Sequence, residues 1–548
     1  MPLAFAIVRM RFAPDVSGFI VKGLIGQYNG RTVEASALPP PLSDNGDLLK
    51  SNVKENDMST RNHPVMRMAL AVAALMLLVQ SASAGREIPA RLPDPDGKAP
   101  ASNKPVKIYI MSGQSNMVGI GQISGGTTRW GKQIINPIVS VYPGEYSPKA
   151  DYDKIKPTAT KKLAVYGGTK PTPFPGGGVQ VVRGHIQMKT AGVYKFNPGY
   201  GNSSHCIMEI DGVEVYRKEV GKKPVHAGFK FAGKKHSFKI TFLTRSADGL
   251  GWCWRTDIPG TLNTVVRVEK KFPHLIDDKG RWTVRKDVWY KGVVTATANK
   301  PLTVGCGSGA NTIGPELQFG HIMGYYHDEP VIIIKASQGN RSLGWDILPP
   351  GGRRFTYEGR TYAGYKDKCP SWIEGQPKKE VNWYAGKQYD DFVKAARDVL
   401  DNFGKHFPQY RDQGYEIAGF AWWQGHKDGN AAHASRYEQN LVSLIKAYRA
   451  EFKAPKAPFV VATIGFGGWE MKGPHVTVAN AQLAVSGDKG KYPEFAGNVL
   501  TVETRGFWKD ASISPRDQGF HYNGNAETYL NVGDALGRGM VKLLNARK

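Results

Sequence analysis

The chain has 548 residues, 41% of them hydrophobic and 12 of them Trp, so it is long enough for more than one domain and a large core. Its 64 Gly and 35 Pro predict many turns and argue against a helical bundle. The formal net charge of +26 fits a nucleic-acid partner, an acidic glycan or a basic surface that is merely solvated. Because the Lys and Arg are scattered and form no basic helix or RNA-binding motif, we expect no nucleic-acid partner.

The first 57 residues differ in composition from the rest of the chain. Their stretch PPPLSDNGDLLKSNVKENDM is polar, contains Pro and shows no periodicity. Such a segment cannot bury enough apolar surface to fold by itself. We interpret residues 1–57 as a disordered, non-native extension upstream of the natural start, which we place at Met58 or Met66.

Residues 58–84 have the three parts of a secretory signal peptide. Arg61 and Arg67 precede an apolar run at residues 68–79, and small residues follow, ending at Ala84. The run has 12 residues, whereas a membrane span needs roughly 20. We therefore expect cleavage near Ala84 and a secreted or periplasmic protein without stable membrane insertion. A signal anchor with a cytoplasmic tail is the alternative.

Five apolar, β-branched segments predict the buried strands of a parallel sheet. They are Lys107–Met111, Val331–Ala336, Ile417–Trp422, Phe459–Ile464 and Val499–Glu503. Helical patterns follow at residues 389–403, 437–452 and 525–544. Strands that alternate with helices predict a three-layer α/β domain, which we assign to residues 104–167 and 269–548.

Residues 168–268 break this rhythm. Segments such as HCIMEIDGVEVYR alternate apolar and polar residues at period two, and Asp211-Gly212 is a strong hairpin signal between two of them. We expect an antiparallel β-sandwich inserted into the α/β domain after its first strand and helix.

The chain has four cysteines, Cys206, Cys253, Cys306 and Cys369, and no C-x-x-C pair. A zinc site is therefore not expected. Whether Cys206 and Cys253 form a disulfide stays open.

Polar residues follow three of the predicted strands and also precede the last helix. Ser115 lies in SGQSN, Gly339 in SQGNRS, Gln424 in WQGH, and Asp517 and His521 in DQGFH. Sites of parallel sheets lie beyond the carboxyl ends of the strands. Taken singly, each residue has a structural explanation, such as a helix cap or a buried amide. Together they supply the nucleophile, the base with its carboxylate, and the oxyanion donors that acyl transfer needs.

These motifs together resemble those of the sialate O-acetylesterase-like carbohydrate esterases of the SGNH hydrolase superfamily. The motifs are GQSNM, WWQG, GPELQFG, IKASQGNRSLGWDILPPG and HYNGNAETYLNVGDALG. The resemblance covers residues 104–130 and about 283–548. It implies a flavodoxin-like catalytic domain, an acetylated carbohydrate as substrate, and no cofactor or metal.

The resemblance also implies a role for each site residue. Ser115 would be the nucleophile, His521 the base and Asp517 its carboxylate. The backbone N–H groups of Ser115 and Gly339 would form the oxyanion hole together with the side-chain amide of Gln424. Asn340, next to Gly339, is a further candidate for substrate binding.

Three departures from the family pattern put parts of this assignment in doubt. Three residues separate Asp517 from His521, whereas the family has two, so Asp510 or another carboxylate could replace Asp517, or Ser115 and His521 could act as a dyad. Asn340 stands where the family has a second Gly, and His426 where it often has Glu.

Two other functions remain open at this point. A chain with this site could be a glycan-binding protein that has lost efficient turnover, or an esterase or lipase that acts on something other than a sugar. The insertion more loosely resembles lectin-like carbohydrate-binding β modules, and it either binds glycan or only shields a sheet edge.

Overall fold

A computed structural model gives the fold. It describes residues 27–28, 31–32, 86–125, 128–129, 133–147, 149–164, 178–198, 205–243 and 251–547. The chain divides into two units, residues 1–76 and 77–548. Within the first unit, β1 (Gln27–Tyr28) and β2 (Arg31–Thr32) pair antiparallel. Apart from these two strands, the predicted extension at 1–57 and the predicted signal peptide at 58–84 lie outside the described residues.

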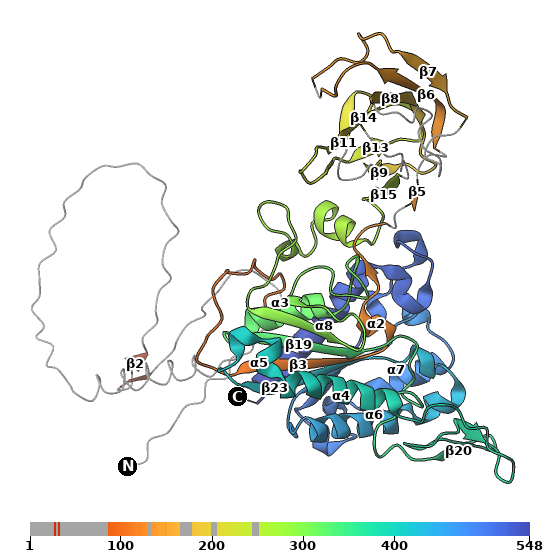
Figure 1. Cartoon of the computed structure of the whole chain (residues 1–548). Coiled ribbons are helices and arrows are strands. Elements are labelled where there is room, and N and C mark those ends of the chain that lie inside the picture. The colour runs from red at the N-terminus through yellow and green to blue at the C-terminus, as the bar shows by residue number, and fades with distance from the viewer. Residues whose placement is uncertain are drawn as a thin grey trace, which may run out of the picture. The chain divides into compact units, whose positions relative to one another are not determined.

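The second unit contains a seven-stranded sheet (Figure 1). In spatial order its strands are β17 (Asn299–Pro301), β16 (Val288–Val293), β19 (Val331–Ser337), β3 (Val106–Gly113), β23 (Tyr415–Trp423), β24 (Phe459–Ala462) and β25 (Val499–Val502). The six strands from β16 to β25 are parallel, and only the edge strand β17 pairs antiparallel. The parallel sheet predicted from the sequence is confirmed, and all five predicted strands lie in it.

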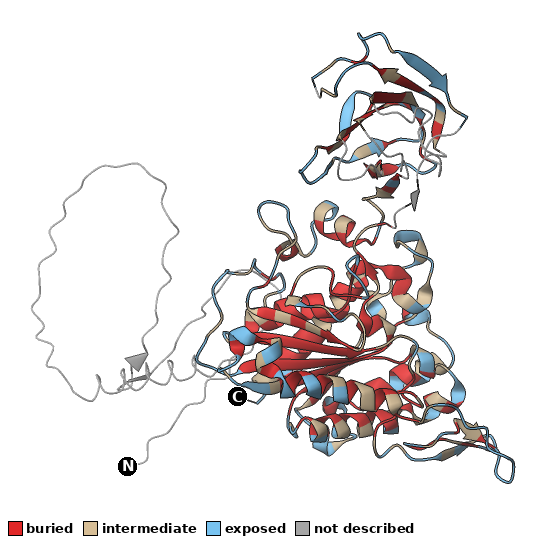
Figure 2. Ribbon diagram, in the orientation of Figure 1, coloured by how far each residue is buried: buried red, intermediate tan, exposed pale blue. Residues whose placement is uncertain are grey.

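Helices cover both faces of this sheet. Alternate residues of each strand point to opposite faces, so each strand contributes to two cores. Ile108 and Ile110 pack in one core with the helices α4 (Lys387–Asp401), α6 (Ala431–Glu451) and α7 (Pro474–Ala484). Tyr109 and Met111 pack in a second core with α3 (Glu316–Tyr326) and α8 (Ala526–Asn545). The sheet is therefore buried on both faces, as the burial colours show (Figure 2). This explains why its strands read as continuous apolar runs.

The two longest helices among the described residues begin at an asparagine. The side chain of Asn430 accepts a hydrogen bond from the backbone N–H of His433 at the start of α6. Asn525 does the same for Glu527 at the start of α8. These caps satisfy backbone donors that have no partner within the helix. The observed helices α4, α6 and α8 overlap the three predicted ones.

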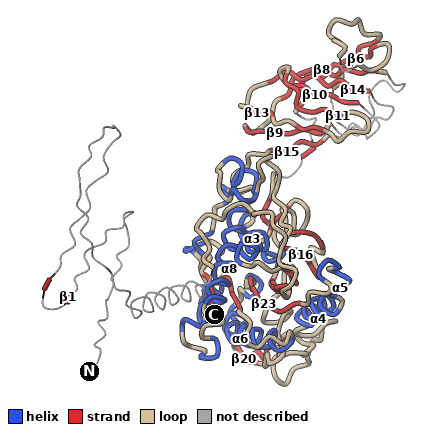
Figure 3. The backbone as a smooth tube through the Cα atoms, turned by 90° about the vertical axis from the view of Figure 1, so that its left-hand side faces the viewer, coloured by secondary structure: helices blue, strands red, loops and turns tan. Residues whose placement is uncertain are grey.

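The described residues between 128 and 255 form two antiparallel sheets, drawn as strands and loops in Figure 3. One contains β12 (Val225–His226), β11 (Val213–Lys218), β10 (His205–Ile210), β14 (His236–Leu243), β8 (Val179–Ile186), β6 (Ile134–Tyr142) and β7 (Ala159–Lys162). The other contains β13 (Phe229–Phe231), β9 (Gly192–Asn197), β15 (Trp252–Arg255) and β5 (Thr128–Arg129). Side chains from both sheets share one core, which includes Phe196 of β9 and Phe242 of β14.

The predicted hairpin of this region is confirmed. Strands β10 and β11 pair on either side of Asp211-Gly212, and both turn residues have positive φ, +48° and +74°. This is the backbone conformation for which Asp-Gly is favoured. The two sheets begin earlier in the chain than residue 168, because β6 pairs with β8 and β7 pairs with β6. The boundaries 168–268 of a separate module stay a prediction.

The remaining helices and strands are short. They are α2 (Ser115–Val118), β4 (Gly121–Gln122), β18 (Thr312–Ile313), β20 (Phe355–Tyr357), β21 (Arg360–Tyr362), β22 (Ser371–Trp372) and α5 (Phe403–His406). All four cysteines are buried, and none of them forms a disulfide, including Cys206 and Cys253. In the described part of the chain, no helix is long and apolar enough to span a membrane.

Candidate active site

Three neighbouring strands of the parallel sheet end at the same level. Gly113, the last residue of β3, pairs with Ser337 of β19 on one side and with Trp423 of β23 on the other. The next residues of these three strands are therefore brought to one edge. Ser115, Gly339 and Gln424 follow these strand ends by one or two residues, so they converge as the motifs predict.

The turn that carries Ser115 is tightly packed. A Cβ atom on Gly113 would lie 2.1 Å from the backbone oxygen of Trp423, so only glycine fits between the two strands. In the short helix α2, Asn116, Met117 and Val118 are buried. Ser115 is partly exposed. The fold thus holds the backbone of this turn while leaving the side chain of Ser115 accessible.

A buried ion pair lies behind this turn. Lys335 of β19 and Glu316 of α3 have no exposed side-chain surface, and their charged groups are 2.9 Å apart. The ammonium of Lys335 also donates to the carbonyl of Val118, the last residue of α2, at 2.8 Å. The carboxylate of Glu316 accepts from the backbone N–H of Gly314 at 2.9 Å. The pair therefore ties the turn of Ser115 to the sheet and to α3, a role the sequence analysis missed.

The loop after β19 places Gly339 beside Ser115. A Cβ on Gly339 would lie 3.6 Å from the Cβ of Ser115. Asn340 is exposed and has φ +57°, a left-handed conformation that Gly adopts freely and Asn tolerates best among the other residues. This accounts physically for Asn at the position where the family has a second Gly.

Gln424 is buried within a network of hydrogen bonds. Its Nε2 lies 2.6 Å from Asp428 Oδ2, 2.9 Å from the carbonyl of Arg341 and 3.2 Å from Gln114 Oε1. Its Oε1 accepts from the hydroxyl of Tyr437 at 2.9 Å. An amide nitrogen has only two protons, and both are donated to these neighbouring acceptors. In this conformation Gln424 ties strand ends together, and the donors left for an oxyanion are the backbone N–H groups of Ser115 and Gly339.

His521 has an amide as its hydrogen-bond partner. Its Nδ1 lies 3.1 Å from Oε1 of Gln518, which therefore accepts the Nδ1 proton and leaves Nε2 as the free base. Gln518 has two residues between itself and His521, the spacing at which the family has its Asp. Sequence reasoning missed Gln518 because it searched for a carboxylate, although the spacing alone would have pointed to it.

The two carboxylates considered from the sequence lie elsewhere. Asp517 is exposed, and within the described residues it makes no hydrogen bond to His521. Asp510 is also exposed and accepts a hydrogen bond from the indole of Trp508 at 2.8 Å. The structure thus brings Ser115 and His521 to one edge, but it does not bring Asp517 to the imidazole.

Asn116 connects the turn of Ser115 to the loop of His521. Its Nδ2 donates to the carbonyl of Phe520 at 3.1 Å, and its Oδ1 accepts from the hydroxyl of Tyr529 at 2.7 Å. The same hydroxyl lies 3.2 Å from the carbonyl of His521. Asn116 and Tyr529 therefore hold the residue after Ser115 against the backbone of His521. In the described structure no direct hydrogen bond joins the side chains of Ser115 and His521. Such bonds often tighten only when substrate is bound.

The surroundings of His521 favour its neutral form. Burial, together with the smaller effect of the positive charges on His426 and Arg516, lowers the pKa of His521 to about 4. The ring of Phe520 packs between the two imidazoles, 4.5 Å from His521 and 5.5 Å from His426. Above about pH 4 the imidazole is therefore neutral and able to accept a proton, although it is a weaker base than an ordinary histidine.

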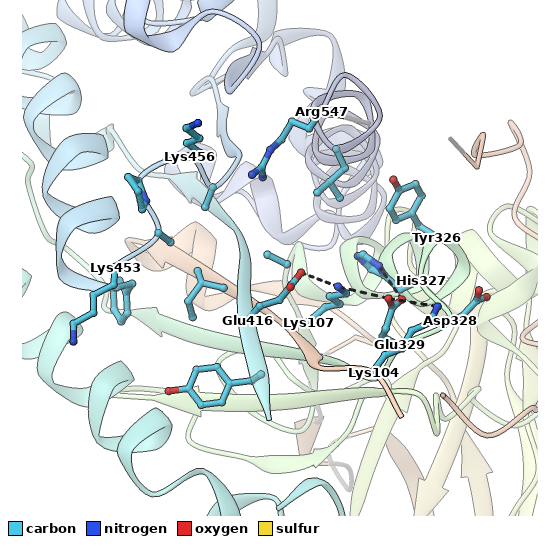
Figure 4. A pocket seen from close by; sticks show the side chains of 18 residues that line it. Lys104, Lys107, Tyr326, His327, Asp328, Glu329, Glu416, Lys453, Lys456 and Arg547 are labelled. Atoms are coloured by element: carbon cyan, nitrogen blue, oxygen red, sulfur yellow. Dashed lines mark hydrogen bonds and ion pairs between the residues drawn. The ribbon is translucent and has the colours of Figure 1, made fainter. Parts of the chain in front are cut away.

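A cavity of about 870 Å³ lies at the opposite edge of the sheet (Figure 4). It is lined by residues at the amino ends of β3 and β23, and its central charges bind one another: Lys107 is 2.7 Å from Glu416 and 3.5 Å from Glu329. Ligands of parallel sheets bind at the carboxyl ends of the strands instead. The volume of this cavity therefore does not make it the catalytic site.

A comparison with protein families matches residues 288–541, from the start of β16 into α8. The family is described as "Carbohydrate esterase, sialic acid-specific acetylesterase". The match confirms the resemblance. It includes Gly339, Gln424 and His521 but covers less than half of the chain, and β3 with Ser115 lies before it. No curated protein matches the chain.

Several solved structures are similar at low identity. A protein from Arabidopsis thaliana is 16% identical, covering 48% of this chain and 87% of that one, with a TM-score of 0.30. A carbohydrate acetylesterase from Xanthomonas citri is 11% identical, covering 66% and 70%, with a TM-score of 0.29. A family 2 carbohydrate esterase with a carbohydrate-binding domain, from Corynascus thermopiles (Myceliophthora fergusii), is 12% identical, covering 69% and 96%, with a TM-score of 0.24. These scores add nothing to the functional assignment.

Proposed function

We propose that the protein is a serine esterase that removes O-acetyl groups from a carbohydrate. The observation that carries the proposal is the convergence of Ser115, Gly339 and the His521 loop at the carboxyl edge of one parallel sheet. The family match over residues 288–541 supports a carbohydrate ester as the substrate.

The geometry suggests how each group acts. The Oγ of Ser115 attacks the acetyl carbonyl while Nε2 of His521 takes its proton, and the Nδ1 proton stays on Oε1 of Gln518. The N–H groups of Ser115 and Gly339 donate to the oxyanion. As the acetyl–sugar bond breaks, His521 returns the proton to the sugar oxygen. Water, activated by the same imidazole, then releases acetate from Ser115.

We further propose that residues 104–167 and 269–548 form an SGNH hydrolase domain and that the protein is exported. The parallel sheet with helices on both faces supports the first part. The second part depends on the predicted signal peptide at 58–84. N-terminal sequencing of secreted protein tests it, because a chain that retains residues before Met58 would contradict cleavage near Ala84.

A second candidate is a glycan-binding protein with little turnover. The observation that favours it is the amide of Gln518 at the position where the family has a carboxylate, since an amide does not neutralise an imidazolium. Acetate release separates the two functions. The esterase should release acetate from 4-nitrophenyl acetate and from at least one member of a panel of O-acetylated glycans, and Ser115→Ala should abolish both. Glycan binding without acetate release would support the second candidate, and a preference for long acyl chains would indicate a non-sugar esterase or lipase.

A further inference from the structure

Trp469 is an exposed tryptophan at the catalytic edge of the sheet. It is 66% exposed, more than any other large hydrophobic side chain in the described part of the chain. It lies in the 3₁₀ helix η5 (Gly468–Glu470), in the loop that follows β24. This loop leaves the sheet at the same edge as the turns of Ser115, Gly339 and Gln424.

The indole of Trp469 is held in place although it is exposed. The guanidinium of Arg505 lies 4.6 Å from the ring centroid. Arg505 is fixed in turn by Glu503, to which its Nη2 and Nε donate at 2.6 and 3.0 Å. Glu503 also accepts from the hydroxyl of Thr463, directly after β24, at 3.0 Å. A chain of polar contacts from the ends of β24 and β25 thus presents the ring in a defined orientation.

The loop that carries Trp469 also touches the loop that carries His521. The backbone N–H of Gly465 donates to the hydroxyl of Tyr522, the residue after His521, at 2.8 Å. The ring of Phe466 packs against Tyr522 at 4.8 Å and against His426 at 5.3 Å. Trp469 therefore stands on a loop that is anchored directly beside the base.

A sugar ring fits such a surface. A pyranose has an apolar face of C–H groups that can cover an indole, while its hydroxyl groups remain in water. Arg505 occupies one face of Trp469, and the high exposed fraction leaves the other surface of the ring open. Because the orientation is fixed before binding, little conformational entropy is lost when a ring stacks on it.

We infer that Trp469 is a stacking platform for a sugar ring of the acetylated carbohydrate, outside the ring whose ester reaches Ser115. The inference rests on the proposed function and names a feature of its substrate: it extends beyond one sugar unit. Trp469 is thus a binding residue for oligomeric or polymeric carbohydrate and has no direct part in bond cleavage.

The test compares O-acetylated xylotetraose with 4-nitrophenyl acetate, which has no sugar to stack. In Trp469→Ala, the ratio of the two kcat/KM values, oligosaccharide over aryl acetate, should fall roughly 10-fold, mainly through KM. Trp469→Phe should recover most of the ratio. Val268→Ala removes another highly exposed side chain, 63% exposed, and should keep the wild-type ratio.

Binding gives an independent readout. The Ser115→Ala protein should bind O-acetylated xylotetraose roughly 10-fold more tightly than the Ser115→Ala/Trp469→Ala protein, measured by calorimetry. An unchanged kcat/KM ratio together with equal or undetectable binding by both proteins would overturn the platform. If the wild type released no acetate even from 4-nitrophenyl acetate, the proposed esterase function would fail, whereas the calorimetric difference would still decide on the platform.

Discussion

The turn of Ser115 and the loop of His521 are built in different ways. The turn of Ser115 is fixed by backbone packing at Gly113 and by the buried pair of Lys335 and Glu316. The loop of His521 is irregular, with left-handed conformations at Tyr522 and Asn523, and its imidazole is oriented by a neutral amide. The difference shows that the fold determines where Ser115 stands, whereas the basicity of His521 depends on a few side chains around it.

The largest effect should come from removing either reacting group. Ser115→Ala and His521→Ala should each lower kcat for 4-nitrophenyl acetate by roughly 1,000-fold or more, because the alcohol is a poor nucleophile without a base. Since the two groups act as one unit, the double variant should lose little more than either single variant. Steady-state kinetics check this. Additive losses would show that Ser115 and His521 act independently.

Removing the buried ion pair behind the turn of Ser115 tests how strongly that pair stabilises the protein. Lys335→Met leaves the buried carboxylate of Glu316 without its partner and should lower the free energy of unfolding by about 3–5 kcal/mol. Urea unfolding followed by circular dichroism measures the loss. Lys394→Met, which removes an exposed ion pair with Asp398, is the matched control and should cost at most about 0.5 kcal/mol. Equal costs for the two variants would contradict the anchoring role of Lys335.

The pH dependence of the reaction reports on the base. His521 has its pKa lowered from the ordinary 6.5 to about 4, so the protonated, inactive form dominates only below that value. The acid limb of kcat/KM should therefore have its midpoint near pH 4, and the rate should be nearly independent of pH between about 5.5 and 7. An acid limb centred near 6.5 would mean that the imidazole is not shielded as the structure shows it.

The amide of Gln518, which contacts His521, can be replaced by a carboxylate. Gln518→Glu keeps the size of the side chain and places a negative charge near Nδ1, which should raise the pKa of His521 by roughly 1–3 units. It should also stabilise the imidazolium formed during attack and raise kcat at pH 7 roughly 10-fold. The pH profile and kcat are measured together. Gln518→Met, similar in size but without a strong acceptor, should instead lower kcat, and identical behaviour of both variants would exclude a role for Gln518 in orienting the base.

The smallest effect should come from Asp517. This exposed carboxylate does not contact His521, so Asp517→Asn should change kcat by less than about twofold. The same assay as for Gln518 measures it. A loss of roughly 100-fold or more would restore Asp517 as the triad carboxylate in the working enzyme.

Much of the fold could be predicted from the sequence, because buried parallel strands are apolar throughout. All five predicted strands lie in the sheet, but β16 was missed because its sequence VWYKGV mixes a Lys and a Gly into a short run. The edge strand β17, NKP, is too short and polar to give a pattern. In the antiparallel region β6 was missed, since Asn136-Pro137 interrupts its apolar residues, and the structure has a register shift there.

The site was predictable where it depends on strand ends and not where it depends on side-chain partners. Ser115, Gly339 and Gln424 converge because their strands share one register. The amide of Gln424 is bound by Asp428 and by Arg341, which lies in a loop distant in the sequence. The partner of His521 is Gln518 and not one of its neighbours in the same loop. Periodicity carries no information about such choices.

The most direct test of the central claim is covalent labelling of the nucleophile. A fluorophosphonate, which reacts with activated serine hydroxyls, should modify the wild-type protein once, and mass spectrometry of the digested protein should place the adduct on the peptide that contains Ser115. His521→Ala should lose most of the labelling, because Ser115 then lacks its base. Acetate release by a protein that is labelled at another residue, or that remains active after Ser115 is replaced by Ala, would contradict the account.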